Sequence, residues 1–471
     1  MSSRSLWQRH RNKVLVSSAT VAFIFSTGAV SLYLIKKWLW KQQLKISEQQ
    51  FVKEQIKRRF VQTQQDALYT MYELVPVLSL VLVKDLDVDE IVGSLKGKKL
   101  SRKVSRGSTD AERDGLSSGM STSVTEAHLA SSSGTPADAR TKAELWNELK
   151  LKSLVKLCTV IYSVSSLLLL TRLQLNILAR REYLESAVKV AVEKESSNKG
   201  FLTSWLNSFW QTASTDTQSA PKEHSTGPDL SEEAQHARKS SYINEQAFLS
   251  FSWWLLNRGW LQFKSLAEKL VEREFAELNP RDVLSVQDFG DRLTRVLHSI
   301  NTELLVQFDV QTENGIQPLK QTLLPDSNLE QFVLQQTLDS DALKLLYDDN
   351  TVLRQLLNET SKCVQSTASL VVLESLVNEA FQFAMLHVEE NVAKKSKRKP
   401  SNSEDTTSVT ASTAGDDEKY QMALFAVSCK GCCDEMLKSG VVSMNNVFLQ
   451  RLDSIPELDD LSASVYSNFG F

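Results

Sequence analysis

Apolar residues recur along most of this chain at the three- and four-residue spacing of a helix face, and Gly and Pro seldom interrupt them. The longest stretch of this kind runs from Glu144 to about Glu195. Its segment Leu157–Thr171 carries no charge, but it falls short of the roughly 20 residues that cross a membrane as a helix. We therefore predict a helix buried on nearly all sides, the spine of a bundle. A second membrane span is the alternative interpretation.

The same pattern predicts a series of further helices along the chain. They cover Lys36 to about Leu74, Tyr242–Leu278, Arg281 to about Thr302, Leu329–Asp348, Thr351 to about Cys363, Ser369–Ala393, Tyr420–Lys438 and Leu458–Asn468. Pro76 should kink or restart a helix, because proline lacks the N–H that a helix interior needs. Asn279 and Pro280 are typical of an N-cap and a first helical residue, so they predict the start of the helix at Arg281.

Three segments are too poor in apolar residues to fold and have the composition of disordered inserts, at about residues 97–140, 196–240 and 394–419. The second insert contains an apolar island, Phe201–Trp210, which could dock on the bundle, touch a membrane or bind a partner. The third begins with the basic run Lys394–Pro400. A solvated loop explains this run better than a nuclear-localisation or nucleic-acid patch, because acidic residues follow it.

The composition supports a helical fold class. Only 16 Gly and 9 Pro occur in 471 residues, well below the average shares of about 7% and 5%. Barrels, sandwiches and Rossmann folds need these residues at their turns and phosphate loops. We therefore expect an all-α protein, an elongated bundle of long helices with disordered inserts.

The N-terminus is basic, whereas the rest of the chain is acidic. Residues 1–60 contain twelve Lys and Arg against two acids, a sum of +10, so the remainder of the chain carries −13. Val14–Ile35 is uncharged and long enough to cross a membrane as one helix. Basic residues flank both ends, and Trp7, Trp38 and Trp40 are placed as interfacial aromatics. A cleaved signal peptide, the rival interpretation, would have a shorter apolar core.

This pattern predicts three parts of the chain. They are a basic tail at residues 1–13, a single transmembrane helix at 14–35, and an all-helical domain at 36–471. Both sides of the span are basic, so charge alone leaves its orientation open. The basic cluster Lys53, Lys57, Arg58 and Arg59 could contact anionic headgroups or form a solvated face.

No catalytic arrangement stands out in the sequence. Ser–His, Cys–His and H-E-x-x-H patterns, the dinucleotide fingerprint and the Walker A loop are all missing. Cys429, Cys432 and Cys433 form C-x-x-C-C, but three thiols with no nearby His fall short of a structural zinc site. A helix face of small apolar residues is the better interpretation. We therefore expect no enzyme activity, no cofactor and no metal, although a membrane-anchored enzyme is a third functional hypothesis.

Trp146 is the candidate binding residue. Trp146 and Leu149 share a helix face, and Lys142 lies one turn earlier on the same side. Such a set could be half of a helix-in-groove site, with an apolar floor and a lysine that meets a partner's acidic group. The alternative is that Trp146 only caps the bundle's own core, and the residues by themselves favour that alternative.

Several motifs resemble the peroxin-3 family of peroxisomal membrane proteins. The long helix contains W-x-x-L-K from Trp146, then L-x-R-x-Q-L-N-I-L, of which Leu173–Leu178 is the most specific part. The remaining matches occur in family order: RRF-x-x-TQ at Arg58–Gln64, LVPVLSLVL around Pro76, LLNET at Leu356–Thr360, and LSASVYSNF at Leu461–Phe469. The long Ser-rich inserts resemble fungal members.

The resemblance implies an all-α bundle in the cytosol, anchored in the peroxisomal membrane by one N-terminal span. It also implies a docking receptor for the amphipathic N-terminal helix of peroxin-19, the chaperone that delivers peroxisomal membrane proteins. Lys142, Trp146 and Leu149 match the family's receptor groove, and no catalysis, cofactor or nucleic acid belongs to the family. A tether or adaptor for inheritance or pexophagy factors is the alternative function.

Overall fold

The computed structural model describes residues 6–107, 140–196, 232–305, 318–348, 350–397, 418–438 and 446–468. The chain divides into two compact units, Met1–Gln62 and Thr63–Phe471. Helices account for nearly all of the secondary structure in the described ranges, which confirms the all-α fold class. The apolar island Phe201–Trp210 and most of the three predicted inserts lie outside these ranges.

The first unit consists of helix α1 (Leu6–Asp85) up to Gln62. The predicted span Val14–Ile35 is part of this helix, but its side chains are outside the described part of the chain, so the span remains a prediction. Trp38 and Trp40, beyond the predicted span, are exposed. Three stretches with described side chains are long and apolar enough to cross a membrane by length and composition: Gln50–Asp85, Lys142–Lys189 and Thr367–Lys395.

In the second unit, α1 passes through Pro76 and ends only at Asp85, so of the two predicted outcomes, a kink or a restart, the restart does not occur. The physical reason is tertiary packing on both sides of the proline. Met71, Val75, Leu78 and Leu82 are buried in the core at helical spacing, which offsets the lost backbone hydrogen bond.

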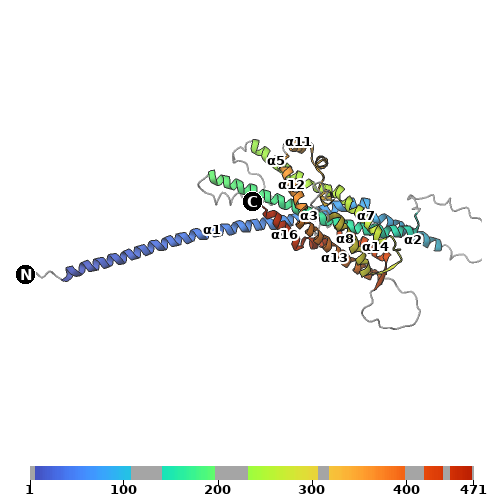
Figure 1. Cartoon of the computed structure of the whole chain (residues 1–471), viewed down its shortest axis with the longest axis horizontal. Helices are drawn as coiled ribbons and strands as arrows, with labels where there is room; N and C mark the ends of the chain where they lie inside the picture. The colour runs from blue at the N-terminus through green and yellow to red at the C-terminus, as the bar shows by residue number, and fades with distance from the viewer. Residues whose placement is uncertain are drawn as a thin grey trace, which may run out of the picture. The chain divides into compact units, whose positions relative to one another are not determined.

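Helix α3 (Lys142–Ser196) lies at the centre of the second unit, as predicted for the spine (Figure 1). Its apolar window is completely buried by protein, and the helix therefore serves as a core element within the bundle. It packs against α2 (Val88–Gly107), α7 (Trp260–Phe275), α13 (Thr367–Lys397), α14 (Met422–Met436) and α16 (Pro456–Ser467).

Buried polar side chains in the second half of α3 bind helices from distant parts of the chain. Arg172 donates to Gln64 of α1 and pairs with Asp453 of α15 (Val447–Asp453). Arg180 pairs with Glu359 of α12 (Thr351–Val364) and donates to the Val465 carbonyl of α16 at 3.1 Å. These contacts join the C-terminal helices to the spine.

The predicted helix Tyr242–Leu278 is divided in the structure. It comprises α5 (Glu232–Ser250), α6 (Ser252–Trp254), a π-helical turn at Leu255–Gly259, and α7. The backbone of α9 (Pro318–Leu323) lies directly against this turn, and a Cβ at Gly259 would fall 1.9 Å from the Thr322 carbonyl oxygen. Only glycine permits this approach, so the division follows from a tertiary contact.

The predicted helix start at Asn279 and Pro280 is wrong. Strand β1 (Val283–Ser285) follows instead, and it pairs antiparallel with β2 (Lys419–Gln421), so that Leu284 lies opposite Tyr420. Helix α8 (Val286–Leu305) begins after Ser285, whose hydroxyl accepts from the backbone N–H of Asp288 at 3.0 Å. Ser285 is therefore the N-cap that sequence reasoning assigned to Asn279.

Some other boundaries also differ from the predictions. Leu329–Asp348 forms two helices, α10 (Glu330–Thr337) and α11 (Ser340–Asp348), because the Asp339 carboxylate caps α11 through the Ala342 N–H. Helix α2 extends to Gly107, α5 begins at Glu232 and α13 ends at Lys397. The edges of all three predicted inserts are therefore helical in the structure.

Candidate functional site at the start of helix α3

The first turn of α3 is a capping box. The Thr141 hydroxyl accepts from the Glu144 N–H at 3.2 Å, and the Glu144 carboxylate accepts from the Thr141 N–H at 2.7 Å. Two backbone N–H groups without helical partners are satisfied in this way. The pattern T-x-x-E at Thr141–Glu144 is present in the sequence, and the helix starts at Lys142, two residues before the predicted Glu144.

The three predicted site residues lie along this helix start with very different exposure. Lys142 is exposed, Trp146 is half-buried, and Leu149 is only 1% exposed. Leu149 belongs to a small apolar cluster, and Trp146 packs against the outside of that cluster. The structure therefore brings the two residues together: Trp146 is the partly accessible side chain, and the buried Leu149 supports it.

Helix α2 supplies most of the cluster, and sequence reasoning missed this helix. The cluster consists of Val88, Ile91 and Leu95 of α2, which are buried against Leu145 and Leu149 of α3, and Val92 is partly buried beside them. The available signal was the spacing of these residues together with Asp87, whose carboxylate accepts from the Glu90 N–H at 2.9 Å as an N-cap. The Gly and Ser content of residues 93–107 obscured that signal.

Ion pairs and one further helix fix the position of α2. Lys430 of α14 pairs with Asp89 of α2 at 2.8 Å and with Asp434 at 2.6 Å, and Val427 of α14 packs against the apolar cluster. Further along α2, Lys98 donates a hydrogen bond to the carbonyl of Arg140, just before α3 begins. Helices α2, α3 and α14 thus meet at one corner, which we call the Trp146 corner.

Charged groups surround this corner. Glu148 pairs with Arg140 and, at 2.9 Å, with Lys152. Partial burial acts to raise the pKa of the Glu148 carboxyl, but Lys152 and Arg140 together outweigh it, and the pKa is lowered overall. The carboxylate is therefore ionised at neutral pH and is already neutralised by Arg140 and Lys152, whereas Lys142 is exposed.

The residue after Leu149 anchors the helix start to the core. The Lys150 ammonium donates to the carbonyls of Phe275, at 2.7 Å, and Leu278, which end α7 and the turn after it. Burial lowers the pKa of Lys150, opposed by the charge of Asp282. A cation at the end of a helix binds carbonyls that have no helical partner, so this contact gives Trp146 a rigid base.

The cysteine cluster near this corner is part of the core. Cys429, Cys432 and Cys433 are buried on α14, and Cys158 is buried on α3. Burial raises the pKa of Cys158 and of Cys433 to about 12, so both are neutral thiols at physiological pH. This confirms the interpretation of the C-x-x-C-C run as a buried helix face. Among the described residues, no three His, Cys, Asp or Glu side chains are grouped so that they could hold a metal.

The Trp146 corner offers binding surface, with an aromatic side chain, an apolar support and a cation at the edge. Aromatic side chains on a well-packed base are typical of the residues that dominate protein interfaces. Nothing in the described corner combines a nucleophile with a base, and the carboxylates Glu148 and Asp89 are held in ion pairs.

Comparisons with known proteins agree over the whole chain. A family model, Peroxin-3, matches residues 5–468. Peroxisomal biogenesis factor 3 of Kluyveromyces lactis is 50% identical and that of Eremothecium gossypii is also 50% identical, each over at least 99% of both chains. Peroxisomal membrane protein PEX3 of Komagataella phaffii is 31% identical over 98% of both chains. This chain therefore belongs to the peroxin-3 family and has a role in peroxisome biogenesis.

Proposed function

We propose that this protein is a docking receptor that captures the amphipathic N-terminal helix of peroxin-19 at the Trp146 corner. Capture would bring newly made membrane proteins to the peroxisome, where they are inserted. The function is binding and placement, without a chemical step. The observation that carries the proposal is the half-buried Trp146 on a rigid apolar support, in a chain that belongs to this family.

Each site residue has a distinct role in this proposal. Trp146 contacts the apolar face of the incoming helix directly, because part of its side chain is accessible. Lys142 is exposed one turn earlier and pairs with an acidic residue at the edge of that helix. Leu149 is buried, so it acts as the support that holds Trp146 and α2 in place.

Helix α2 is the second wall of the proposed groove. Val92 is partly buried and packs on the same cluster as Trp146, so the two side chains flank one apolar surface. An amphipathic helix bound between α2 and α3 would bury its apolar face against them. The ion pair between Lys430 and Asp89 then becomes a positioning contact, since it fixes α2 against α14.

The binding test uses the full chain in detergent micelles and a fluorescent peptide of the peroxin-19 N-terminal helix. Trp146→Ala should weaken binding by about 2 kcal/mol or more, roughly thirtyfold, because a central aromatic contact is lost. Tyr242→Ala removes an exposed aromatic side chain from α5 and should leave the affinity unchanged. Equal affinity of Trp146→Ala and the parent chain would refute the site.

The membrane placement is part of the same proposal. Val14–Ile35 would cross the peroxisomal membrane once, with the second unit in the cytosol. Support comes from the uncharged stretch with its basic flanks and from the name peroxisomal membrane protein carried by a relative. Protease treatment of intact peroxisomes should digest an epitope tag at the C-terminus. Protection of that tag would contradict the proposed orientation.

A further inference from the structure

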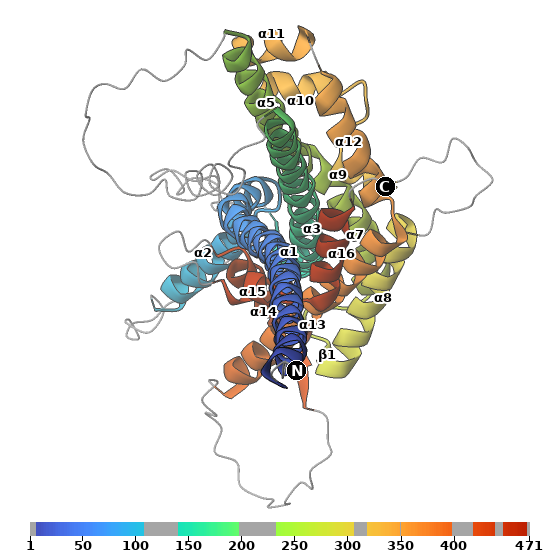
Figure 2. The ribbon, with the colours of Figure 1, turned by 90° about the vertical axis from the view of Figure 1, so that its left-hand side faces the viewer.

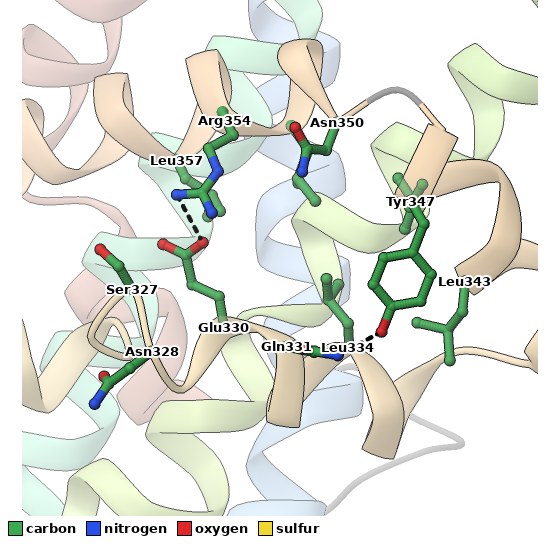
Figure 3. Close-up of a pocket in the computed structure, with 12 residues that line it drawn as sticks. Ser327, Asn328, Glu330, Gln331, Leu334, Leu343, Tyr347, Asn350, Arg354 and Leu357 are labelled. Carbon is green, nitrogen blue, oxygen red and sulfur yellow. Dashed lines mark hydrogen bonds and ion pairs between the residues drawn. The ribbon is translucent and has the colours of Figure 1, made fainter.

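A cavity of about 220 Å³ opens between α10, α11 and α12, away from the Trp146 corner. We call it the α10–α12 pocket (Figure 3). Five leucines line it, from all three helices: Leu334, Leu343, Leu346, Leu353 and Leu357. Three of these, Leu346, Leu353 and Leu357, are buried, so the lining is continuous with the core.

Two polar contacts cross the pocket and join its walls. Gln331 of α10 donates to the Tyr347 hydroxyl of α11 at 2.6 Å, and Arg354 of α12 pairs with Glu330 of α10 at 3.4 Å. Helix α5 packs against α10, α11 and α12, and Figure 2 shows these helices gathered on one side of the molecule. The pocket is therefore preformed between supported helices, and a ligand would not need to order them.

The exposed charge in the pocket is the cation. The side chain of Arg354 is 53% exposed, whereas that of Glu330 is 18% exposed and lies deeper. Burial raises the pKa of Glu330, although the charges of Arg354 and Lys320 act against the rise. Their ion pair is long and joins only one guanidinium nitrogen to one carboxylate oxygen, so Arg354 keeps several N–H donors for an incoming group.

The size and lining of the pocket favour side chains of a protein over a small molecule. Typical small-molecule pockets measure about 300–1,000 Å³, more than this cavity offers. Leucines surrounded by an exposed tyrosine and an exposed arginine match the residues that dominate peptide and protein interfaces. Tyr347 is 59% exposed and can cover a bound apolar side chain.

From this geometry we infer that the α10–α12 pocket binds a short segment of a partner protein that combines two features. A large aliphatic or aromatic side chain enters between the leucines. An Asp or Glu within about one helical turn of it accepts a bidentate pair of hydrogen bonds from Arg354. Glu330 is a positioning residue, because its more buried carboxylate orients the Arg354 guanidinium through their ion pair.

The pocket and the Trp146 corner are separate binding surfaces. The corner is built from α2, the start of α3 and α14, whereas the pocket uses α10, α11 and α12. In Figure 1, α2 lies at the end of α3 opposite to α5 and α11. One protein could thus hold two different partners, and failure at one site would leave the other unaffected.

The test selects random peptides displayed on phage with the full chain in detergent micelles. A peptide is taken to depend on the pocket when both the Arg354→Gln variant and the Tyr347→Ala variant fail to bind it. Arg281→Gln, which alters an exposed arginine before β1, is the matched control. Arg354→Gln should retain the fold, because the arginine side chain is more than half exposed and the glutamine amide can still donate to Glu330. Melting temperatures of the variants check this point.

We expect pocket-dependent peptides to share a large apolar side chain and a nearby Asp or Glu. Their affinity should fall at least about tenfold with Arg354→Gln, and Trp146→Ala should not change it. Three outcomes would overturn the inference. They are the absence of pocket-dependent peptides, the selection of basic peptides, and binding only after the apolar residues of Phe201–Trp210 are replaced by Ser. The last would mean that the chain's own segment fills the pocket.

Discussion

At the start of α3, Trp146 is half-buried above a small cluster of apolar residues, and Lys142 beside it is exposed. Further along the same helix, Arg172 is 2% exposed and binds residues from both ends of the second unit. The first region presents an apolar ring to its surroundings. The second region buries the Arg172 guanidinium inside the protein, where Asp453 and Gln64 bind it.

The difference shows that the residues that identify the family are not the residues that form the candidate site. The block Leu173–Leu178, the most specific part of the resemblance, contains Gln174 and Asn176, both buried and hydrogen-bonded within the bundle. Buried polar groups need particular partners at particular distances, so their sequence is distinctive. The most recognisable block therefore holds the fold together, and the binding candidate lies about seven helical turns away.

The largest expected effect comes from breaking the second region. Arg172→Ala leaves Asp453 and Gln64 without their buried partner and should lower the free energy of unfolding by about 3–5 kcal/mol. Differential scanning fluorimetry of the full chain in detergent measures the loss. Arg181→Ala, at a partly exposed pair with Glu185 one turn apart, is the control and should cost about 1 kcal/mol. Similar melting temperatures for both variants would show that the buried pair is not structural.

A smaller effect should follow from weakening the start of the helix. Thr141→Ala removes the hydroxyl that accepts from Glu144, which should cost about 1 kcal/mol and loosen the turn that carries Lys142. We expect a few-fold weaker binding of the peroxin-19 peptide, less than the loss caused by Trp146→Ala. Thr294→Ala changes an exposed threonine inside α8 and should leave that affinity as it is. An unchanged affinity for Thr141→Ala would mean that the capping box does not position the site.

The smallest effect has the opposite sign. Ser165 is completely buried on α3, and its hydroxyl has no hydrogen-bond partner within the described residues. Ser165→Ala removes a desolvated polar group and should raise the free energy of unfolding by up to about 1 kcal/mol. Ser462→Ala is the matched change at a buried hydroxyl that donates to the Leu458 carbonyl at 2.7 Å, and it should be destabilising. Denaturant unfolding of both variants compares the signs, and destabilisation by Ser165→Ala would refute this account.

The sequence predicted regular helices well where apolar spacing was long and uninterrupted. The predicted Glu144–Glu195 and the observed Lys142–Ser196 agree closely, because the apolar period is a local property. Prediction failed at Asn279 and Pro280, where a local N-cap signal was overridden. The pairing of β1 with β2 joins residues far apart in the chain, and no local pattern reports such a contact.

The candidate site shows the same division. The shared face of Lys142, Trp146 and Leu149 is a local consequence of helix geometry, but their assignment to a binding site came from the family resemblance. Their exposure was not predictable from that spacing. Leu149 is buried and Trp146 is accessible because α2 covers one and only part of the other, and α2 was not among the predicted helices.

The all-α class and the central helix could be predicted because apolar period and composition are local properties, and the family could be recognised from its motifs. The continuation of α1 through Pro76, the glycine-dependent turn at Gly259, the α10–α12 pocket and the two walls of the Trp146 corner follow only from the folded structure. Each of these depends on contacts between different elements, and all but the pocket join segments that are far apart in the sequence. Burial of apolar surface there outweighs local conformational preference, and that free energy exists only once the chain has folded.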